Sequence, residues 1–510
     1  MKALRIDPHD SVAVALEPLK AGKRVEVEGE AVELLDPIPR GHKLALCDIK
    51  AGSPVIKYGC PIGKAVFDIK KGQHVHTHNV KTLLSEGGEY RYEPVTHGLP
   101  PRTGRTFDGF LRSDGSAAIR NEVWIVPTVF CVNHVARELE AYATGRLGSF
   151  ENVDGCLALT HPYGCSQAGE DFRTTQNLLS ALCAHPHAAC VLVLGLGCEN
   201  NNLGVFRDCV VSCCTHCSPP TPAMPHAPDG SARVFYLNCQ DVEDELEVGR
   251  GIVEEMLSIA NQAHRTQLPL SSLTIGMKCG GSDGLSGITA NPLIGRVSDA
   301  LAAEGGACVM TEVPEMFGAE QILMNRARDE GVFMQCEALI RDFKRYFTSH
   351  GQEVSGNPSP GNKEGGITTL EDKSLGCVQK GGRSPVCSVL RYAERVREKG
   401  LSLLQAPGND GVSSTALAAS GCNLILFSTG RGTPFATAVP TLKISSNTAL
   451  FEKKPGWIDF DAGRVVSGAS FEQLTAELLD LVVKTASGHK SKSELRGFHE
   501  IVIWKDGVTM

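Results

Sequence analysis

Short segments of alternating apolar and polar residues fill the first ninety positions of the chain. Four segments share one pattern: an apolar residue, two mostly basic or small residues, a glycine and a short alternating stretch. They begin at Leu19, Ile38, Ile49 and Ile69. Glycine permits a tight turn, and alternation with a period of two is typical of strands with one buried face. The pattern predicts a small all-β domain over residues 1–92.

The pattern changes after residue 107. Apolar runs then alternate with helical periodicity, and many runs end in glycine or small polar residues; examples are Val123–Val129, Val191–Leu196, Leu273–Met277 and Leu424–Phe427. Buried strands that lead into glycine-bearing loops are typical of parallel α/β sheets, in which ligands collect beyond the carboxyl ends of the strands. We therefore expect an extended, proline-bearing linker over 93–107 and two α/β domains over 108–268 and 269–510.

Composition and charge exclude several classes of protein. The chain has 510 residues, with 50 basic and 58 acidic side chains, a net charge of −8 and no long basic run. Partners such as nucleic acids or anionic membranes are therefore not expected. The sequence has no apolar stretch of about 18 residues and no apolar signal core at its start, so we expect a cytoplasmic location. Its 19 cysteines are then expected to be reduced thiols or metal ligands.

A histidine-rich run ends the predicted β domain. If it is a strand, His74, His76 and His78 share one face, because residues two apart point the same way. Three imidazoles on one face could bind a divalent metal or exchange protons near neutral pH. A solvated edge strand explains the pattern equally well.

Several polar loops follow predicted strands. His161 and Cys165 follow one apolar run and Cys198 follows another, which suits metal ligation or proton transfer. The glycine-rich stretch from Cys279 to Pro292 offers backbone amides to an anion and polar side chains to hydroxyl groups. A weaker metal candidate is the segment 209–230, which is expected to be an irregular loop; it contains Cys213, Cys214, His216 and Cys217 among five prolines.

The second half of the chain adds charged groups to such loops. Glu312 and Glu315 follow an apolar run as hard oxygen ligands or as an acid and a base. Lys363 lies in a proline- and glycine-rich loop as a possible base or electrostatic clamp, and Arg431 is suited to bidentate binding of a carboxylate. Together the loops predict a site for a small, oxygen-rich anion.

These motifs, in this order, resemble the altronate/galactarate dehydratase family over nearly the whole chain. The stretches that carry the resemblance are His74–Thr82, Arg120–Trp124, His161–Gln167, Gly195–Asn201, Cys279–Pro292, Thr311–Gln321, Asn357–Gly376, Ala406–Asp410, Phe427–Pro434 and Trp457–Asp461. The galactarate branch of the family lacks the histidine-rich strand. Because this chain has it, the chain resembles the altronate branch.

The resemblance implies a fold and an activity. The fold is an N-terminal β-clip (SAF-like) domain, a middle α/β domain that mediates dimerisation, and a C-terminal Rossmann-like domain with a parallel sheet. The activity is that of a hydro-lyase that dehydrates D-altronate to 2-dehydro-3-deoxy-D-gluconate in hexuronate catabolism. The implied cofactor is Fe²⁺, for which Mn²⁺ or another divalent ion could substitute, and the implied assembly is a homodimer.

Residue roles follow from placing this chemistry on the matching loops. The metal ligands are expected among Cys165, Cys198, Cys279 and Glu312, with His76 or His161 contributing. The base is expected to be Lys363 or His161, and the acid His76 or His78. Arg431 would hold the carboxylate, and the remaining substrate contacts are expected from Ser282, Asp283, Thr289, Asn291, Asn357 and Lys81.

Three alternatives stay open at this point. The chain could be a lyase acting on galactarate, another sugar acid or a sulfolactate-type acid. It could be a sugar-acid binding protein without catalysis. It could also be an iron–sulfur protein, because Cys131, Cys165, Cys198 and Cys279 each end a separate segment.

Overall fold

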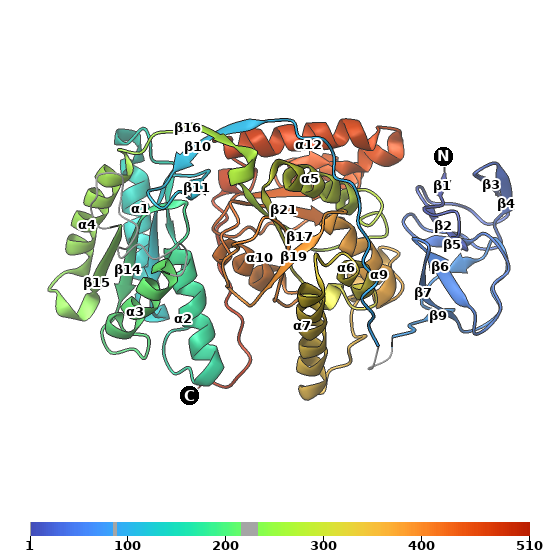
Figure 1. The fold of residues 1–510 in the computed structure, drawn as a ribbon, viewed down its shortest axis with the longest axis horizontal. Helices are drawn as coiled ribbons and strands as arrows, with labels where there is room; N and C mark the ends of the chain where they lie inside the picture. The colour runs from blue at the N-terminus through green and yellow to red at the C-terminus, as the bar shows by residue number, and fades with distance from the viewer. Residues whose placement is uncertain (1, 85–88, 216–232, 510) are drawn as a thin grey trace.

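The computed structural model describes residues 2–84, 89–215 and 233–509 and has a β-rich start, as predicted (Figure 1). One antiparallel sheet has the order β1-β2-β5-β8; its strands are β1 (Ala3–Leu4), β2 (Val12–Ala15), β5 (Lys43–Ala45) and β8 (His74–Val75). The hairpin β3 (Arg24–Val27) and β4 (Glu30–Glu33) and the sheet β6 (Pro54–Lys57), β7 (Cys60–Ala65) and β9 (Val80–Lys81) complete the N-terminal domain.

The four repeated segments pair with one another in this domain. Leu19 forms an antiparallel bridge with Ile38, and Ile49 forms one with Ile69. All four side chains are buried. Each repeat then turns through its glycine, and at Gly72 an added Cβ would lie 1.9 Å from the carbonyl oxygen of Glu33. The repeat therefore forms two related pairs, Leu19 with Ile38 in one buried cluster and Ile49 with Ile69 in another.

The segment that follows runs along the C-terminal domain. The Tyr92 hydroxyl donates to the carbonyl of Ala327 at 2.9 Å, and the Val95 amide donates to the carbonyl of Asn325 at 2.8 Å. The chain then forms β10 (Thr106–Leu111), which pairs antiparallel with β11 (Ala117–Ala118) and β16 (Thr266–Pro269). This small sheet joins the start and the end of the middle region.

The middle region is a four-stranded parallel sheet in the order β13-β12-β14-β15. Its strands are β12 (Glu122–Pro127), β13 (Gly155–Ala158), β14 (Ala188–Gly195) and β15 (Val234–Asn238). The helices α1 (Asn133–Arg146) and α4 (Glu245–Ala260) share one buried cluster with the sheet, and α2 (Gly169–Cys183) and α3 (Leu203–Thr215) share another.

Helix α3 corrects the prediction of an irregular loop over 209–230 for residues 209–215, and residues 216–230 lie outside the described part of the chain. The helix continues to Thr215 because Leu203, Phe206 and Val210 supply an apolar stripe that packs against the sheet. The metal candidate built on Cys213, Cys214, His216 and Cys217 lies outside the residues and side chains that the structure describes.

The C-terminal region contains a seven-stranded parallel sheet, which confirms the predicted α/β class. Its order is β19-β20-β18-β17-β21-β22-β23. The strands are β17 (Thr274–Cys279), β18 (Ala307–Met310), β19 (Val386–Leu390), β20 (Gly400–Leu404), β21 (Leu424–Thr429), β22 (Thr441–Ser445) and β23 (Phe460–Asp461). Their nearly continuous burial is typical of strands covered on both faces.

Helices cover both faces of this sheet. Helices α5 (Ala290–Glu304) and α12 (Phe471–Ala486) pack on one face, and α10 (Asp410–Ala419) packs on the other, against α2 of the middle region. The remaining helices are α6 (Glu320–Met324), α7 (Glu330–Ser349), α8 (Pro360–Glu364), α9 (Leu370–Cys377) and α11 (Thr448–Lys453). The middle and C-terminal regions thus share a core.

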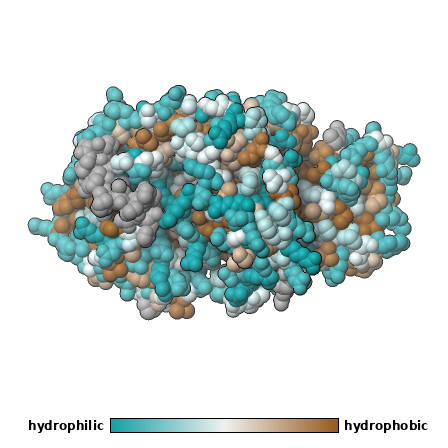
Figure 2. All heavy atoms as spheres, in the orientation of Figure 1, coloured by the Kyte–Doolittle hydropathy of each residue, from teal (hydrophilic) through white to brown (hydrophobic). Residues whose placement is uncertain are grey.

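The surface of the molecule is mostly hydrophilic on the face shown in Figure 2. Figure 2 shows hydrophilic side chains over most of one face, with apolar side chains scattered among them. Within the ranges that the structure covers, no helix is long and apolar enough to cross a membrane.

Candidate functional site

A buried group of charged side chains lies at the carboxyl ends of the central strands of the large sheet. Cys279 is the last residue of β17, Glu312 and Glu315 follow β18, and Asp410 begins α10 after β20. Ligands of open parallel sheets bind at this edge. Glu312 has a left-handed backbone with φ of 68°, a strained conformation for a residue with a side chain, which is frequent at functional sites.

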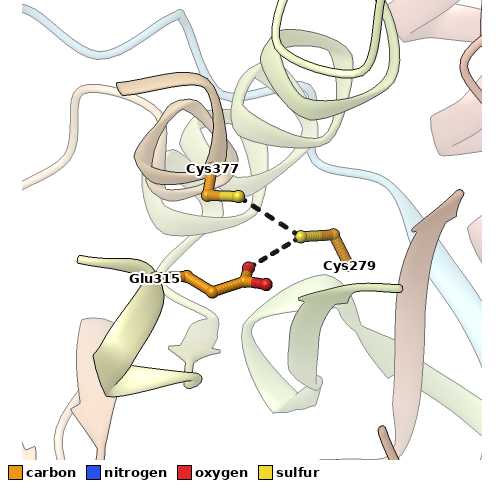
Figure 3. A group of neighbouring side chains, drawn as sticks. All are labelled: Cys279, Glu315 and Cys377. Atoms are coloured by element: carbon orange, nitrogen blue, oxygen red, sulfur yellow. Dashed lines mark hydrogen bonds between the residues drawn. The ribbon is translucent and has the colours of Figure 1, made fainter. Parts of the chain in front are cut away.

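Two thiols and one carboxylate meet at this edge. The Cys279 Sγ lies 2.9 Å from the Glu315 Oε2 and 3.4 Å from the Sγ of Cys377, which ends α9 (Figure 3). All three residues are buried, and among the described residues they are the group of side chains whose ligand atoms lie close enough to hold one metal ion. The sequence contributes them from three segments far apart along the chain.

Three lysines surround the carboxylates. Lys278 bridges Glu312 at 3.1 Å and Asp410 at 2.7 Å. Lys373 contacts Glu315 at 2.8 Å, and Lys380 lies 3.2 Å from Glu312. Each ammonium therefore has a carboxylate partner, which a buried charge requires.

The pKa values of these groups reflect two opposing causes. Burial would raise the pKa of Glu315, but the ammonium groups of Lys373 and Lys380 and the Cys279 thiol lower it to about 2. Burial would lower the pKa of Lys373, but Glu315 raises it above its usual value. The hydrogen bond from Cys279 and burial raise the pKa of the Cys377 thiol. Near neutral pH the carboxylate and the ammonium are charged, and the Cys377 thiol keeps its proton.

This charge pattern fits a divalent metal. The three ammoniums of Lys278, Lys373 and Lys380 balance the three carboxylates of Glu312, Glu315 and Asp410. A divalent ion that displaces the protons of two thiols adds no net charge to the buried group. Thiolate and carboxylate ligands also suit a transition metal such as iron.

A cavity of about 830 Å³ opens next to this group. Its wall includes Cys279, Glu315, Asn357, Lys373 and Asp410. The Asp410 side chain is 39% exposed, whereas those of Glu312 and Lys278 are fully buried. Of the carboxylates of Glu315 and Asp410 on this wall, that of Asp410 is therefore the more accessible to a small molecule, since the Glu315 side chain is 6% exposed.

Gly280 keeps this wall open beside Asp410. A Cβ at this position would lie 2.6 Å from both carboxylate oxygens of Asp410 and 2.7 Å from the ring of Phe427. Only glycine fits so close an approach, which explains part of the glycine-rich stretch after β17.

The N-terminal domain docks on the helix that carries two of these residues. Lys43 and Lys57 reach across the interface to the two oxygens of Asp372 in α9, at 2.8 and 2.9 Å. Asp372 directly precedes Lys373 of the cavity. Burial would raise the pKa of Asp372, but the two lysines hold it far below its usual range.

The predicted histidines gather at the same interface. The strand β8 ends at Val75, and His76 begins a turn in which its carbonyl accepts from the amides of Asn79 and Val80. The rings nevertheless lie together: the centroids of His74 and His76 are 5.6 Å apart, and those of His74 and His78 are 5.2 Å apart. His42, which precedes β5, joins them.

Three predicted site residues belong to the charged group or line its cavity: Cys279, Glu312 and Asn357. The amide of Cys279 donates to the Glu312 carboxylate at 2.8 Å, and Lys373 donates to the Asn357 side chain at 3.1 Å. Arg431 lies next to the cavity wall: a Cβ added to Gly281, which lines the cavity, would be 3.5 Å from the Arg431 Cβ. Its guanidinium donates to Glu364 at 3.1 Å and is exposed.

Four predicted substrate ligands instead bond to the protein itself. Asp283 accepts from the hydroxyls of Ser286 and Ser446. Thr289 donates to backbone carbonyls, Asn291 bridges Gly376 and Ser428, and the carbonyl of Ser282 accepts from Asn362. These contacts hold the loops that shape the cavity.

The structure does not bring the other predicted residues to this group. Cys165 and Cys198 lie in the middle region beside Asn200 and Gln240. His161 is also there and is buried; its Nε2 lies 2.8 Å from the Pro127 carbonyl, its Nδ1 accepts from the Tyr163 amide, and burial lowers its pKa to about 4. The side chains of Lys363, Lys81 and His78 are exposed.

Sequence reasoning missed the charged residues of the central cluster that lie inside regular structure. Lys373, Cys377 and Lys380 are spaced by four and three residues, which places them on one helical face. Lys278 interrupts an apolar run at the end of β17. The sequence signals that could have indicated these residues are a lysine within an apolar strand and a polar stripe along one face of a short helix.

The fold and site define an α/β protein with a β-rich N-terminal domain docked beside a buried thiol–carboxylate group. Three family descriptions match it in order: "Altronate/galactarate dehydratase SAF domain" over residues 1–83, "D-galactarate dehydratase/Altronate hydrolase, second domain" over 109–261, and "D-galactarate/Altronate dehydratase, C-terminal" over 270–509. The chain belongs to the altronate/galactarate dehydratase family, which confirms the resemblance seen in the sequence.

Full-length relatives agree with this assignment. The chain is 47% identical to the altronate dehydratase of Escherichia coli K12, covering 100% of both chains. It is 48% identical to the altronate dehydratase of Bacillus subtilis 168, covering 99% of both. It is 33% identical to the L-threo-forming galactarate dehydratase of Escherichia coli K12, covering 97% of this chain and 95% of the relative.

Proposed function

We propose that this protein is a hydro-lyase that dehydrates D-altronate to 2-dehydro-3-deoxy-D-gluconate. The full-length similarity to two altronate dehydratases carries the choice of substrate. The lower identity to a galactarate dehydratase makes galactarate the second candidate. The cavity wall carries the Lys373 ammonium, which suits the carboxylate of an acid, and the side chains of Glu315, Asp410 and Asn357, which suit hydroxyl groups.

The reaction requires removal of the proton at C2 and departure of the hydroxyl at C3. Loss of the C2 proton builds negative charge next to the carboxylate, so the site must stabilise an extra charge. Lys373 is suited to this task, because its ion pair with Glu315 keeps the ammonium charged despite burial and holds it at the cavity wall. We assign it to the substrate carboxylate.

Asp410 is our candidate for the base that takes the C2 proton. Its carboxylate is held by Lys278 at 2.7 Å and reaches the cavity. Of the two predicted bases, His161 is buried in the middle region and Lys363 is exposed on α8. The C2 proton goes to Asp410, and the C3 hydroxyl leaves as water after protonation. The resulting enol takes a solvent proton at C3 while its C2 hydroxyl loses a proton to solvent, which gives the 2-keto product. The acid roles of His76 and His78 stay predictions.

Cys279, Glu315 and Cys377 are the residues that we propose hold Fe²⁺. When bound, the ion would supply Lewis-acid chemistry to the oxygens of the substrate. The dimer and the cytoplasmic location stay predictions.

Isotope incorporation tests the reaction directly. In D₂O under anaerobic conditions with iron(II), D-altronate should give a product with one deuterium at C3. Asp410→Asn should lose turnover and also any wash-out of the C2 proton, while Asp108→Asn, an exposed control, should keep both. Wild-type turnover without deuterium at C3 would contradict the enol pathway.

A further inference from the structure

Four imidazoles meet where the N-terminal domain touches the C-terminal domain. The ring centroid of His42 lies 5.1 Å from that of His74 and 4.7 Å from that of His76. The ring of His78 lies next to that of His74. The Thr368 hydroxyl lies 3.1 Å from the Nδ1 of His76. This cluster has ligands different from those of the thiol group, and the mechanism above does not use His42 or His74.

The hydrogen bonds of His42 fix its tautomer. Its Nε2 lies 3.0 Å from the carbonyl oxygen of Glu364. A carbonyl only accepts, so this nitrogen carries the hydrogen. In the neutral ring with its hydrogen on Nε2, the other nitrogen, Nδ1, holds a lone pair. A histidine that donates its other nitrogen to a backbone carbonyl is the usual arrangement of a metal ligand.

The lone pair of His42 faces a second imidazole nitrogen. The Nδ1 of His42 and the Nε2 of His74 are 3.0 Å apart. Two nitrogens bound to one ion at about 2.1 Å would be about 3.0 Å apart at a right angle and about 3.4 Å apart at the tetrahedral angle. The pair is therefore already spaced as two ligands of a shared ion.

Further imidazoles lie beside this pair. The ring centroid of His76 is 4.7 Å from that of His42, and the ring centroid of His78 is 5.2 Å from that of His74. A third imidazole ligand would come from one of these two rings.

We propose that His42 and His74, completed by His76 or His78, bind a divalent transition-metal ion at the interface of the N-terminal and C-terminal domains. Imidazole ligands select ions such as Zn²⁺, Fe²⁺ or Co²⁺ over Mg²⁺ or Ca²⁺. The ion would fasten the N-terminal domain to the carbonyl end of α8, next to Glu364 and Arg431. It is a second site, separate from Cys279, Glu315 and Cys377.

Cobalt binding to the full-length, metal-free protein tests this site. Co²⁺ should bind the Cys279→Ser/Cys377→Ser variant in a 1:1 ratio, with visible ligand-field absorption and without the charge-transfer band of a thiolate. The His42→Gln/His74→Gln variant should lose this component and keep the thiolate band. The His134→Gln variant changes an exposed histidine on α1 and should behave like the wild type.

Thermal unfolding provides a second readout that does not depend on activity. Zn²⁺ should raise the unfolding midpoint of the Cys279→Ser/Cys377→Ser variant, because an ion that binds only the folded chain stabilises it. It should not raise that midpoint after His42→Gln and His74→Gln are added. Unchanged cobalt binding by a folded His42→Gln/His74→Gln variant, or no binding by the folded cysteine variant, would show that the two nitrogens share only a hydrogen bond.

Discussion

The ammonium of Lys43 lies 2.8 Å from the carboxylate of Asp372, and both side chains are fully buried. This contact joins β5 of the N-terminal domain to α9 of the C-terminal domain. The next residue along α9, Lys373, lines the cavity and contacts Glu315. Docking of the N-terminal domain and the position of a cavity ammonium are therefore coupled through adjacent residues of one helix.

Asp372→Asn should destabilise the protein strongly. It leaves the ammoniums of Lys43 and Lys57 buried beside a neutral amide, a change that typically costs about 3–5 kcal/mol of the free energy of unfolding. Urea unfolding measures the loss. The control is Asp68→Asn, which breaks an exposed pair with Lys50 and should have a much smaller effect. Equal effects of the two substitutions would refute the role of the buried contact.

Lys373→Met should reduce kcat by roughly 10²–10³, because it removes a charge placed to stabilise the transition state. Lys363→Met should change kcat by no more than a few-fold, since Lys363 is exposed on α8. Steady-state kinetics with D-altronate compare the two variants. A large loss of kcat in Lys363→Met, together with an active Lys373→Met, would instead support Lys363 as the base and would remove Lys373 from the proposed site.

The proximity of Cys279 and Cys377 predicts sensitivity to oxidants. Their sulfurs are 3.4 Å apart, so a two-electron oxidant such as diamide should join the metal-free thiols in a disulfide that dithiothreitol reverses. Peptide mapping should find the Cys279–Cys377 link and parallel loss of activity. Loading with Fe²⁺ before the oxidant should protect both thiols. Cys47→Ser, which removes an exposed cysteine, should leave the link unchanged.

The histidine cluster predicts a loss of stability in mild acid. Burial and Lys43 lower the pKa of His76 to about 3 in the folded protein, whereas an unfolded histidine titrates near 6.5. The unfolded chain therefore binds the proton first, and stability should fall as the pH drops below about 6.5, by up to about 1.4 kcal/mol per pH unit for each such ring. Urea unfolding with chelator from pH 7 to pH 5 measures this slope.

His76→Gln should make the slope shallower, and Thr77→Gln, a neighbouring exposed and non-titrating change, should keep it. An identical slope in the wild type and in His76→Gln would show that the folded ring binds protons as readily as the unfolded one.

The fold was largely predictable because its signals are local. The repeated glycine turns predicted the β-rich start, and the apolar runs before glycine loops predicted the parallel sheets. The sequence also predicted that Cys279 and Glu312 lie at or just after the ends of strands, as they do. It could not show that Cys165 and Cys198 belong to a different sheet. A thiol after a buried strand has the same local pattern in both sheets, and only tertiary packing separates them.

The lysines and Cys377 of the site could not be read in the same way. Their function depends on partners more than thirty residues away, such as Glu315 for Lys373. Likewise, the histidine run was predicted as one strand face, whereas a turn after Val75 and the distant His42 bring the rings together. Local pattern predicts elements, and the site is formed by contacts between them.

Anaerobic turnover of D-altronate, with D-galactarate and D-mannonate in parallel and with and without iron(II) and thiol, tests the central claim most directly. The account predicts iron-dependent release of 2-dehydro-3-deoxy-D-gluconate from D-altronate and little or no product from the other two acids. A folded, iron-loaded protein that leaves D-altronate unchanged would contradict it.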